Sequence, residues 1–264
     1  MQSDEQKESV LGEEKTVKIR LENISKIFGV AKTKLVVFQD INAEIFKQEF
    51  VSVIGPSGGG KSTLLFIMAG LLPTTEGRVL IDGKEVTEPG RDRGLVFQQD
   101  SIFPWRSVIE NVEYGLELRS VSQKERREVA MNYLKLVNLE KFANFWPKEL
   151  SGGMKKRVAL AMVWANQPDV LLMDEPFGSL DYPTKVDLQN KLLEMWGRDK
   201  KTTVFVTHDI EEAVFLSDRI FVLTDGNIRH TLKVPFGRPR TDDLRTDKEF
   251  QEIRRQLWGY TARG

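Results

Sequence analysis

Residues 50–70 read FVSVIGPSGGGKSTLLFIMAG, and this stretch decides the fold. A β-branched apolar run leads into a glycine-rich turn and then into an apolar segment of helical length. The stretch therefore fits the motif G-x-x-x-x-G-K-[ST] in the strand–turn–helix context that the motif requires. The alternative, a glycine-rich turn with a chance lysine, is disfavoured by the number of matched positions. We predict a phosphate-binding loop that consists of Gly55, Pro56, Ser57, Gly58, Gly59, Gly60, Lys61, Ser62 and Thr63.

Each part of this loop has a physical task in binding a nucleoside triphosphate. Glycines let the backbone curl, so that successive N–H groups point into one concavity. The helix that begins near Lys61 adds the positive end of its dipole, and Lys61 is expected to reach the β- and γ-phosphates. Ser62 is expected to give its hydroxyl oxygen to Mg²⁺.

The composition excludes several classes of protein. Lys plus Arg and Asp plus Glu both total 39, so no net charge draws the chain onto nucleic acid or an anionic membrane. The absence of Cys excludes disulfides and thiol chemistry, and two histidines, His208 and His230, disfavour a histidine-built metal site. We expect neither a signal peptide nor a membrane span, because no apolar run is long enough. At 264 residues the chain allows one large domain or two small ones.

A charged start and a β-rich part precede the loop. Residues 1–16 are rich in Glu, Gln, Ser and Lys, and we expect this lead-in to be disordered. From Val17 apolar and charged residues alternate, as in a half-buried strand with Lys18 on its polar face. Further strands are expected at 35–38, 41–46 and 78–81. Together they predict an antiparallel sheet beside the phosphate-binding core.

Two residues near the expected sheets are candidate nucleotide contacts. Phe28, ahead of the second strand, could stack on an adenine ring, although an aromatic residue here could equally be packing. Gln98 ends a short apolar strand, where its amide could coordinate Mg²⁺ or a water. Alternatively, it is a loop amide that bonds to backbone.

Residues 99–165 are predicted to form a helical subdomain inserted between core strands. Helical periodicity runs through 109–118 and 124–139. The insertion ends in LSGGM, residues 150–154, followed by a third periodic segment. Ser151 can cap this last helix, while Gly152 and Gly153 leave its first N–H groups open to an anion. The same pattern also fits an ordinary capped helix with a flexible entry.

Two later strands end in titratable side chains. A continuous apolar run, typical of a buried parallel strand, precedes Asp174 and Glu175. Because such sheets bind ligands at the carboxyl ends of their strands, Asp174 is predicted to hold the Mg²⁺ bound through Ser62, and Glu175 to orient or deprotonate the attacking water. His208 ends another apolar strand and could hydrogen-bond the γ-phosphate or that water. A solvated acidic pair and a structural histidine are the alternatives.

The last thirty or so residues have no motif. Residues 235–264 carry two prolines, several arginines and a helical pattern at 248–258. We assign this tail no chemistry. The expected organisation is thus a lead-in at 1–16, one domain at 17–234 with its helical insertion at about 99–165, and the tail.

Taken together in this order, these motifs resemble those of the ATPase subunits of ABC transporters, over about residues 17–234. The resemblance implies an α/β fold: a P-loop NTPase core with a mainly parallel sheet, an antiparallel β subdomain and an inserted α-helical subdomain. It implies ATP and Mg²⁺ as ligands. By analogy the loop is the Walker A motif, LSGGM the signature motif, and the strand ending in Asp174 and Glu175 the Walker B strand with its catalytic glutamate.

Other positions take their roles only from this resemblance. Gln98 is similar to the Q-loop glutamine, Asp181 lies in a D-loop-like segment that contacts nucleotide in the family, and His208 is similar to the switch histidine. Phe28 stands where the family carries its adenine-stacking aromatic. Lys61, Gln98, Glu175 and His208 are therefore the implied catalytic residues.

The resemblance also implies partners. In relatives, the serine of the signature completes the ATP site of a second subunit, so we expect a head-to-tail homodimer, or a pair with a homologous ATPase, around two ATP molecules. In relatives a groove beside the Q-loop accepts a short helix of a membrane permease. Phe103 and Trp105 could be exposed anchors there or core residues of the insertion. This implies a place on the cytoplasmic face of the inner membrane, with a permease and a substrate-binding protein.

Two short sequence segments are most similar to one branch of the family. FPWR at 103–106, and a signature ending in Met154 rather than Gln, are similar to importers of nitrate, sulfonates, taurine and bicarbonate. The alternatives are a soluble ABC ATPase of DNA repair or translation, and the ATPase chain of an exporter. The balanced charge and the single copy of each motif disfavour a nucleic-acid partner. The transported substrate cannot be read from a chain that does not hold it.

Overall fold

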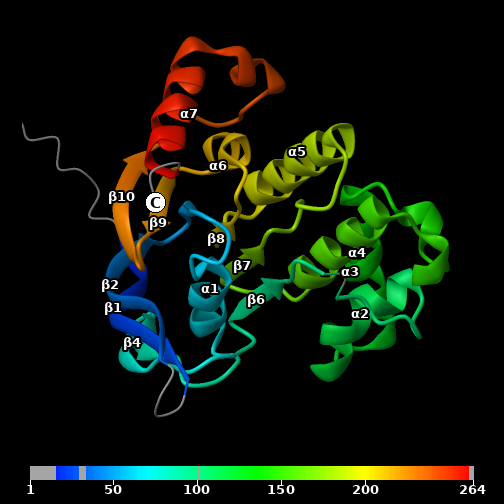
Figure 1. Cartoon of the computed structure of the whole chain (residues 1–264). Helices are drawn as coiled ribbons and strands as arrows, with labels where there is room; N and C mark the ends of the chain where they lie inside the picture. Colours follow the sequence, from blue (N-terminus) through cyan, green and yellow to red (C-terminus); the bar gives the residue numbers. More distant parts are fainter. Residues whose placement is uncertain (1–15, 30–33, 100, 262–264) are drawn as a thin grey trace, which may run out of the picture.

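A six-stranded sheet is the centre of the computed structural model, which describes residues 16–29, 34–99 and 101–261 (Figure 1). Its strand order is β10-β9-β3-β8-β7-β6, and all neighbouring strands are parallel except the antiparallel pair β9 and β10. The strands are β3 (Phe50–Ile54), β6 (Arg93–Val96), β7 (Val170–Asp174), β8 (Thr202–Val206), β9 (Arg219–Thr224) and β10 (Asn227–Lys233).

The inner strands are buried on both faces. Every residue of β3, β7 and β8 is buried, as expected for continuous apolar runs in a parallel sheet. The helix α1 (Lys61–Ala69) covers one face together with the antiparallel sheet. The other face is covered by α5 (Tyr182–Arg198), α6 (Ile210–Leu216) and α7 (Lys248–Thr261). Two hydrophobic cores therefore lie on the two sides of one sheet.

The predicted antiparallel sheet is present, with two differences from expectation. Its strand order is β2-β1-β4-β5. The separate strands expected at 35–38 and 41–46 are one strand, because the chain passes through a left-handed residue, Asp40 at φ 53°, without leaving the ladder. The strands are β1 (Val17–Phe28), β2 (Leu35–Phe46), β4 (Glu76–Ile81) and β5 (Lys84–Glu85).

Lys18 is the second difference. The alternating pattern placed it on the polar face of its strand, but the residue is only 6% exposed. Its ammonium nitrogen lies 2.6 Å from an Asp82 carboxylate oxygen and 3.4 Å from one of Asp169. The buried charge is thus paired twice, and it joins the antiparallel sheet to the loop before β7.

The helical insertion lies between β6 and β7, where it was predicted. Its helices are α2 (Val108–Leu118), α3 (Gln123–Leu136) and α4 (Gly152–Ala165), with short 3-10 turns η1 (Glu140–Phe142) and η2 (Pro147–Glu149). A capping box starts α2, in which Ser107 accepts from the Glu110 N–H while the Glu110 carboxylate accepts from the Ser107 N–H. α3 ends earlier than the expected 139, because Asn138 adopts a left-handed φ of 58°.

The C-terminal tail folds onto the core. α7 contains the predicted helical pattern and runs on to Thr261, after the short turn η3 (Asp242–Thr246). Phe250 and Leu257 are fully buried in the same core as α5 and α6. In the ranges described above, no helix combines the length and the apolar character that crossing a bilayer requires.

Candidate functional site

The predicted site residues of the core meet at one edge of the central sheet. Because β3, β7 and β8 are parallel and in register, their carboxyl ends lie side by side, with Val53 and Asp174 both paired to Val206. Lys61, the first residue of the helix after β3, and Glu175 and His208, in the segments after β7 and β8, follow these strand ends. Ligands of open parallel sheets bind at this edge.

The glycine loop after β3 has no room for side chains at two positions. A Cβ at Gly55 would lie 2.1 Å from the Leu223 carbonyl oxygen, and one at Gly60 would lie 2.6 Å from Val37. Gly60 also has a φ of 88°, in the left-handed region that favours glycine. The helix α1 that follows has no side-chain cap and no acidic residue in its first turn. Its N–H groups are therefore available to an anion.

Lys61 lies inside this loop. It is 5% exposed, and its ammonium group donates to the carbonyl oxygens of Gly55 at 3.1 Å and Pro56 at 2.9 Å. Burial lowers the pKa of Lys61, while Glu175 and Asp174 act in the opposite direction. A buried cation held by neutral carbonyls is an electrostatic site for phosphate oxygens.

Ser62 and Asp174 form a pair beside it. The Ser62 hydroxyl donates to an Asp174 carboxylate oxygen at 2.8 Å, across from α1 to the end of β7. Burial raises the pKa of Asp174, and Glu175 adds to this, while the Ser62 hydrogen bond and Lys61 oppose it. A hydroxyl and a carboxylate oxygen in contact are the hard ligands that Mg²⁺ prefers, so this pair fits the predicted metal.

A magnesium ion held here needs further oxygen ligands. Across the described residues, no group of three or more His, Asp or Glu side chains is placed to hold a metal. Mg²⁺ typically binds through one or two carboxylates and completes its shell with waters and substrate phosphates. The Ser62–Asp174 pair fits a metal that takes its remaining ligands from waters and phosphates.

Glu175 and His208 form the second pair. The Glu175 carboxylate oxygen Oε2 lies 2.9 Å from Nδ1 of His208. The backbone of Glu175 is left-handed, with a φ of 42°, and its N–H donates to the Val206 carbonyl at 2.9 Å. A non-glycine residue at such a φ is strained, and here the strain turns the carboxylate toward the end of β8. Two residues that were predicted separately, at the ends of two strands, are therefore in contact.

Gln98 is placed at the border of the helical subdomain. Its side chain is exposed, and its backbone carbonyl accepts a hydrogen bond from the ammonium group of Lys156 on α4. Lys156 belongs to none of the motifs recognised in the sequence. It is 4% exposed, but its neighbour Lys155 carries the same charge, so the sequence offered no signal that only one of them is buried.

The signature residues lie away from the glycine loop of their own chain. Ser151 caps α4 by accepting from the Met154 N–H at 3.3 Å, as expected of a capped helix, and both Ser151 and Gly152 are exposed. Figure 1 shows α4 within the helical subdomain, with β6 between it and α1. The helix N-terminus therefore faces solvent and not the Lys61 site.

Two further predicted contacts are exposed at the ends of elements. Phe28 is the last residue of β1 and 39% exposed, with the Lys26 ammonium group 4.8 Å from its ring centroid. Asp181 caps α5 by accepting from the Thr184 N–H, and the hydrogen bonds with Thr184 lower its pKa. The next residue, Tyr182, is 62% exposed. Neither Phe28 nor Asp181 bonds to the Lys61 site.

The fold and the site together define a nucleoside triphosphatase of the P-loop class. A family model described as ABC transporter matches residues 38–178. The chain belongs to the ABC transporter family.

Relatives match over nearly the whole chain. An uncharacterized ABC transporter ATP-binding protein of Methanocaldococcus jannaschii is 50% identical, over 91% of this chain and 90% of that protein. The nitrate import ATP-binding protein NrtD of Synechocystis is 46% identical, over 87% and 88% of the two chains. Proteins named for aliphatic sulfonate, bicarbonate and taurine transport also match. The resemblance to this branch of the family is confirmed.

Solved structures confirm the predicted fold. A dimeric ATP-binding cassette in a post-hydrolysis state, bound to ADP and Pi, superposes with a TM-score of 0.75 at 37% identity. The match covers 83% of this chain and all of that one.

The raised pKa of Asp174 leads to a stability prediction. Ionising this carboxyl in the fold costs free energy, and the cost is present above the folded-state pKa and vanishes below the ordinary carboxyl pKa. Asp174→Asn should therefore raise the free energy of unfolding of the nucleotide-free protein at pH 7 to 8. The gain should fade as the pH falls toward about 4. Urea titrations across this range measure it.

Asp181→Asn is the matched control, because hydrogen bonds lower the pKa of that carboxyl. It should have the opposite sign and destabilise the protein at neutral pH. If Asp174→Asn also destabilised the nucleotide-free protein at pH 7 to 8, the electrostatic description of the site would be wrong.

Proposed function

We propose that this chain is the ATP-binding and ATP-hydrolysing subunit that powers an ABC importer. The observation that carries the proposal is the meeting of three groups at one sheet edge: buried Lys61, the Ser62–Asp174 pair and the Glu175–His208 pair. Relatives are named for import of nitrate, aliphatic sulfonates and taurine and for transport of bicarbonate. We propose a small anion of that kind as the cargo.

The residues divide into those that bind the phosphates and those that act on water. The backbone of residues 55–60, the N-terminus of α1 and Lys61 hold the triphosphate. Ser62 and Asp174, with Gln98 from the border of the helical subdomain, hold Mg²⁺, which neutralises charge on the phosphates when bound. Phe28, exposed at the end of β1, supplies an apolar face for the adenine.

Glu175 is the proposed general base. Its carboxylate oxygen Oε2 lies 2.9 Å from His208 Nδ1. Glu175 directly follows Asp174 of the Ser62–Asp174 pair. Glu175 accepts a proton from water as that water attacks the γ-phosphate. His208 holds the carboxylate in position, and because its side chain is 54% exposed, the rest of its ring remains accessible to a phosphate oxygen.

Replacing Glu175 by Gln tests this assignment. Without the base, the rate of ATP hydrolysis should fall about 10²- to 10⁴-fold, while ATP binding persists because the phosphate-binding groups are unchanged. Phosphate release and nucleotide affinity measure the two effects. Glu252→Gln, on the exposed surface of α7, should keep the original rate. Near-normal hydrolysis by Glu175→Gln would remove this residue from the role of base.

The active assembly is proposed to be a head-to-tail pair. Ser151 and Gly152 present the exposed N-terminus of α4 away from their own chain's loop, so they can complete a site only in a second copy or a homologous ATPase. The similar solved cassettes are dimeric. Asp181 and Tyr182, exposed at the start of α5, belong to the same seam.

Mixing two inactive variants tests the shared site. Ser151→Arg should block only the partner's site, and Lys61→Ala only the chain's own site. A mixed dimer then holds one intact site, so mixing should restore up to about half of the activity per dimer. Steady-state ATPase measurements over a range of mixing ratios show this. No recovery, although mass spectrometry detects mixed dimers, would contradict the head-to-tail arrangement.

A groove beside the helical subdomain is the proposed permease contact. It has a volume of about 600 Å³, and its lining includes Arg93, Tyr114 and Leu118. The Phe103 ring packs edge-on against Tyr114, with ring centroids 4.5 Å apart, and it also contacts the Trp105 ring. Trp105 is 70% exposed and Leu118 is 69% exposed. Large exposed apolar residues of this kind anchor interfaces. The chain would thus be held at the cytoplasmic face of the membrane by a permease, itself served by a substrate-binding protein.

Leu118→Glu tests the groove. A charge there should reduce co-purification with the permease at least about tenfold. The variant loses one buried leucine contact and must bury a charge at the interface. The ATPase activity of the isolated chain should not change. Trp258→Glu, equally exposed on α7, is the control and should leave co-purification intact.

Two other measurements separate the alternatives. Retention on nucleic acid at moderate salt, without any permease, would favour a soluble ABC ATPase of repair or translation. Loss of efflux rather than uptake on deletion of the chain would favour an exporter. The balanced totals of 39 acidic and 39 basic residues argue against the first of these.

A further inference from the structure

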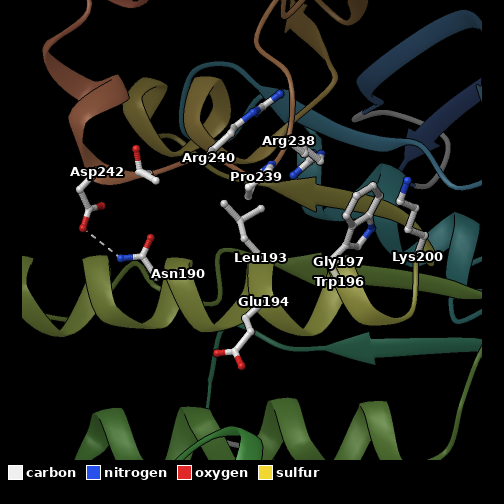
Figure 2. A pocket seen from close by; sticks show the side chains of 11 residues that line it. Asn190, Leu193, Glu194, Trp196, Gly197, Lys200, Arg238, Pro239, Arg240 and Asp242 are labelled. Atoms are coloured by element: carbon white, nitrogen blue, oxygen red, sulfur yellow. Dashed lines mark hydrogen bonds between the residues drawn. The ribbon is translucent and has the colours of Figure 1, made fainter.

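A second large cavity lies between α5 and the C-terminal tail, away from the sheet edge that carries the nucleotide residues. Its volume is about 690 Å³, and Figure 2 shows its walls: α5 on one side and residues 238–242 on the other. Leu193 and Pro239 line it with apolar atoms, together with the edge of Trp196, which is itself only 2% exposed. A volume of 300–1,000 Å³ and an apolar lining with a few polar groups are typical of small-molecule sites.

The tail side of this cavity carries an excess of positive charge. Arg238 and Arg240 share one carboxylate oxygen of Asp218, at 2.9 Å and 3.7 Å. Their side chains are 20% and 1% exposed. Burial lowers the pKa of both, that of Arg240 to about 10, and the neighbouring Arg238 adds to the effect on Arg240. The buried guanidinium group of Arg240 and the partly buried one of Arg238 thus share a single carboxylate.

The other charged groups of the lining do not remove this excess. Glu194 is bonded to Arg198 at 2.7 Å and to Lys191 at 3.1 Å, and Figure 2 shows its carboxylate turned away from Arg238. Asp242 accepts from Asn190 at 3.1 Å and pairs with Arg245. The exposed Lys200 adds a further positive charge at the rim. The cavity is therefore complementary to an anion.

Arg238 lines the cavity and has one guanidinium nitrogen to spare. Its guanidinium carbon lies 4.2 Å from the centroid of the Trp196 ring, which fixes the plane of the group. Nε and Nη2 donate to Asp218 and to the Leu216 carbonyl. Within the described residues Nη1 donates to no acceptor. Lys200 lies on the same indole, with its ammonium group 5.9 Å from the centroid.

We propose that this cavity binds a small organic anion, a carboxylate or sulfonate group carried on a flat apolar body. The anionic oxygens accept from Arg238 Nη1, the Lys200 ammonium group at the rim adds a longer-range attraction, and the apolar body packs against Leu193 and Pro239 and the edge of Trp196. Such a ligand contacts both α5 and the tail and clamps one to the other. The inference is independent of the cargo and of the permease.

Calorimetry with a matched set of probes tests the proposal. The full chain, saturated with ADP to occupy the nucleotide site, is titrated with 2-naphthoate, naphthalene-2-sulfonate, neutral 2-naphthamide and inorganic phosphate. At least one of the two organic anions should bind about tenfold or more tighter than the amide, because hydrogen bonds to charged groups are stronger. Inorganic phosphate, which lacks the apolar body, should bind more weakly than both. Equal affinity for anion and amide, or tighter binding of phosphate, would overturn the proposal.

Three variants locate the binding. Lys200→Gln changes an exposed side chain and should weaken binding of the anion about three- to tenfold. Arg238→Lys keeps the charge but removes the planar fork, and it should weaken binding further. Arg255→Gln removes one positive charge from the exposed surface of α7 and should have no effect.

An indole signal reports the position of the probe. The anion should shift the Trp196 N–H cross-peak, assigned through Trp196→Phe, in a ¹H–¹⁵N spectrum. If Arg238→Lys does not fold, the affinity of Lys200→Gln and the shift of this cross-peak show whether the probe binds in this cavity. If Lys200→Gln binds the anion with unchanged affinity and the Trp196 N–H cross-peak does not shift, the probe binds elsewhere and the proposal is wrong.

Discussion

Parallel pairing of β3, β7 and β8 is the constraint on which the rest of the structure depends. These strands are fully buried, so both faces of the sheet must be covered, and the helices and the antiparallel sheet do this. Because the strands run in one direction, the loops after them open at one edge. Lys61, the adjacent residues Asp174 and Glu175, and His208 come from three distant parts of the sequence and become neighbours for this reason.

The site so formed is electrostatically unfavourable without its ligand. Lys61 is buried against neutral carbonyls, Asp174 is buried beside a second carboxylate, and Glu175 has a left-handed backbone. Each of these features costs stability in the nucleotide-free chain. The two buried charges are also what a bound triphosphate and its metal would relieve, since phosphate oxygens would pair with the lysine and a cation with the carboxylates. Burying these charges is thus linked thermodynamically to nucleotide affinity.

The C-terminal tail packs against the rest of the domain through buried apolar residues and ion pairs. Phe250 and Leu257 are buried in the core shared with α5 and α6. Arg245 of the tail donates hydrogen bonds to Glu211 and Gln189 of the domain. Arg238 and Arg240 instead leave a positive charge unbalanced next to a cavity. A segment held this firmly can carry a binding site, because its side chains keep fixed positions relative to α5.

The sequence by itself determined the glycine loop, the strands that end in Asp174 and His208, the helical insertion and the class of protein. These features are local: a turn that only glycine allows, or an apolar run of strand length, is visible within a dozen residues. Only the tertiary structure decided that Lys18 is buried between two aspartates, that Lys156 rather than Lys155 reaches the Gln98 carbonyl, and that Arg238 and Arg240 flank a cavity. Those facts depend on contacts between residues about 20 to 150 positions apart, and no local pattern encodes which partners folding brings together.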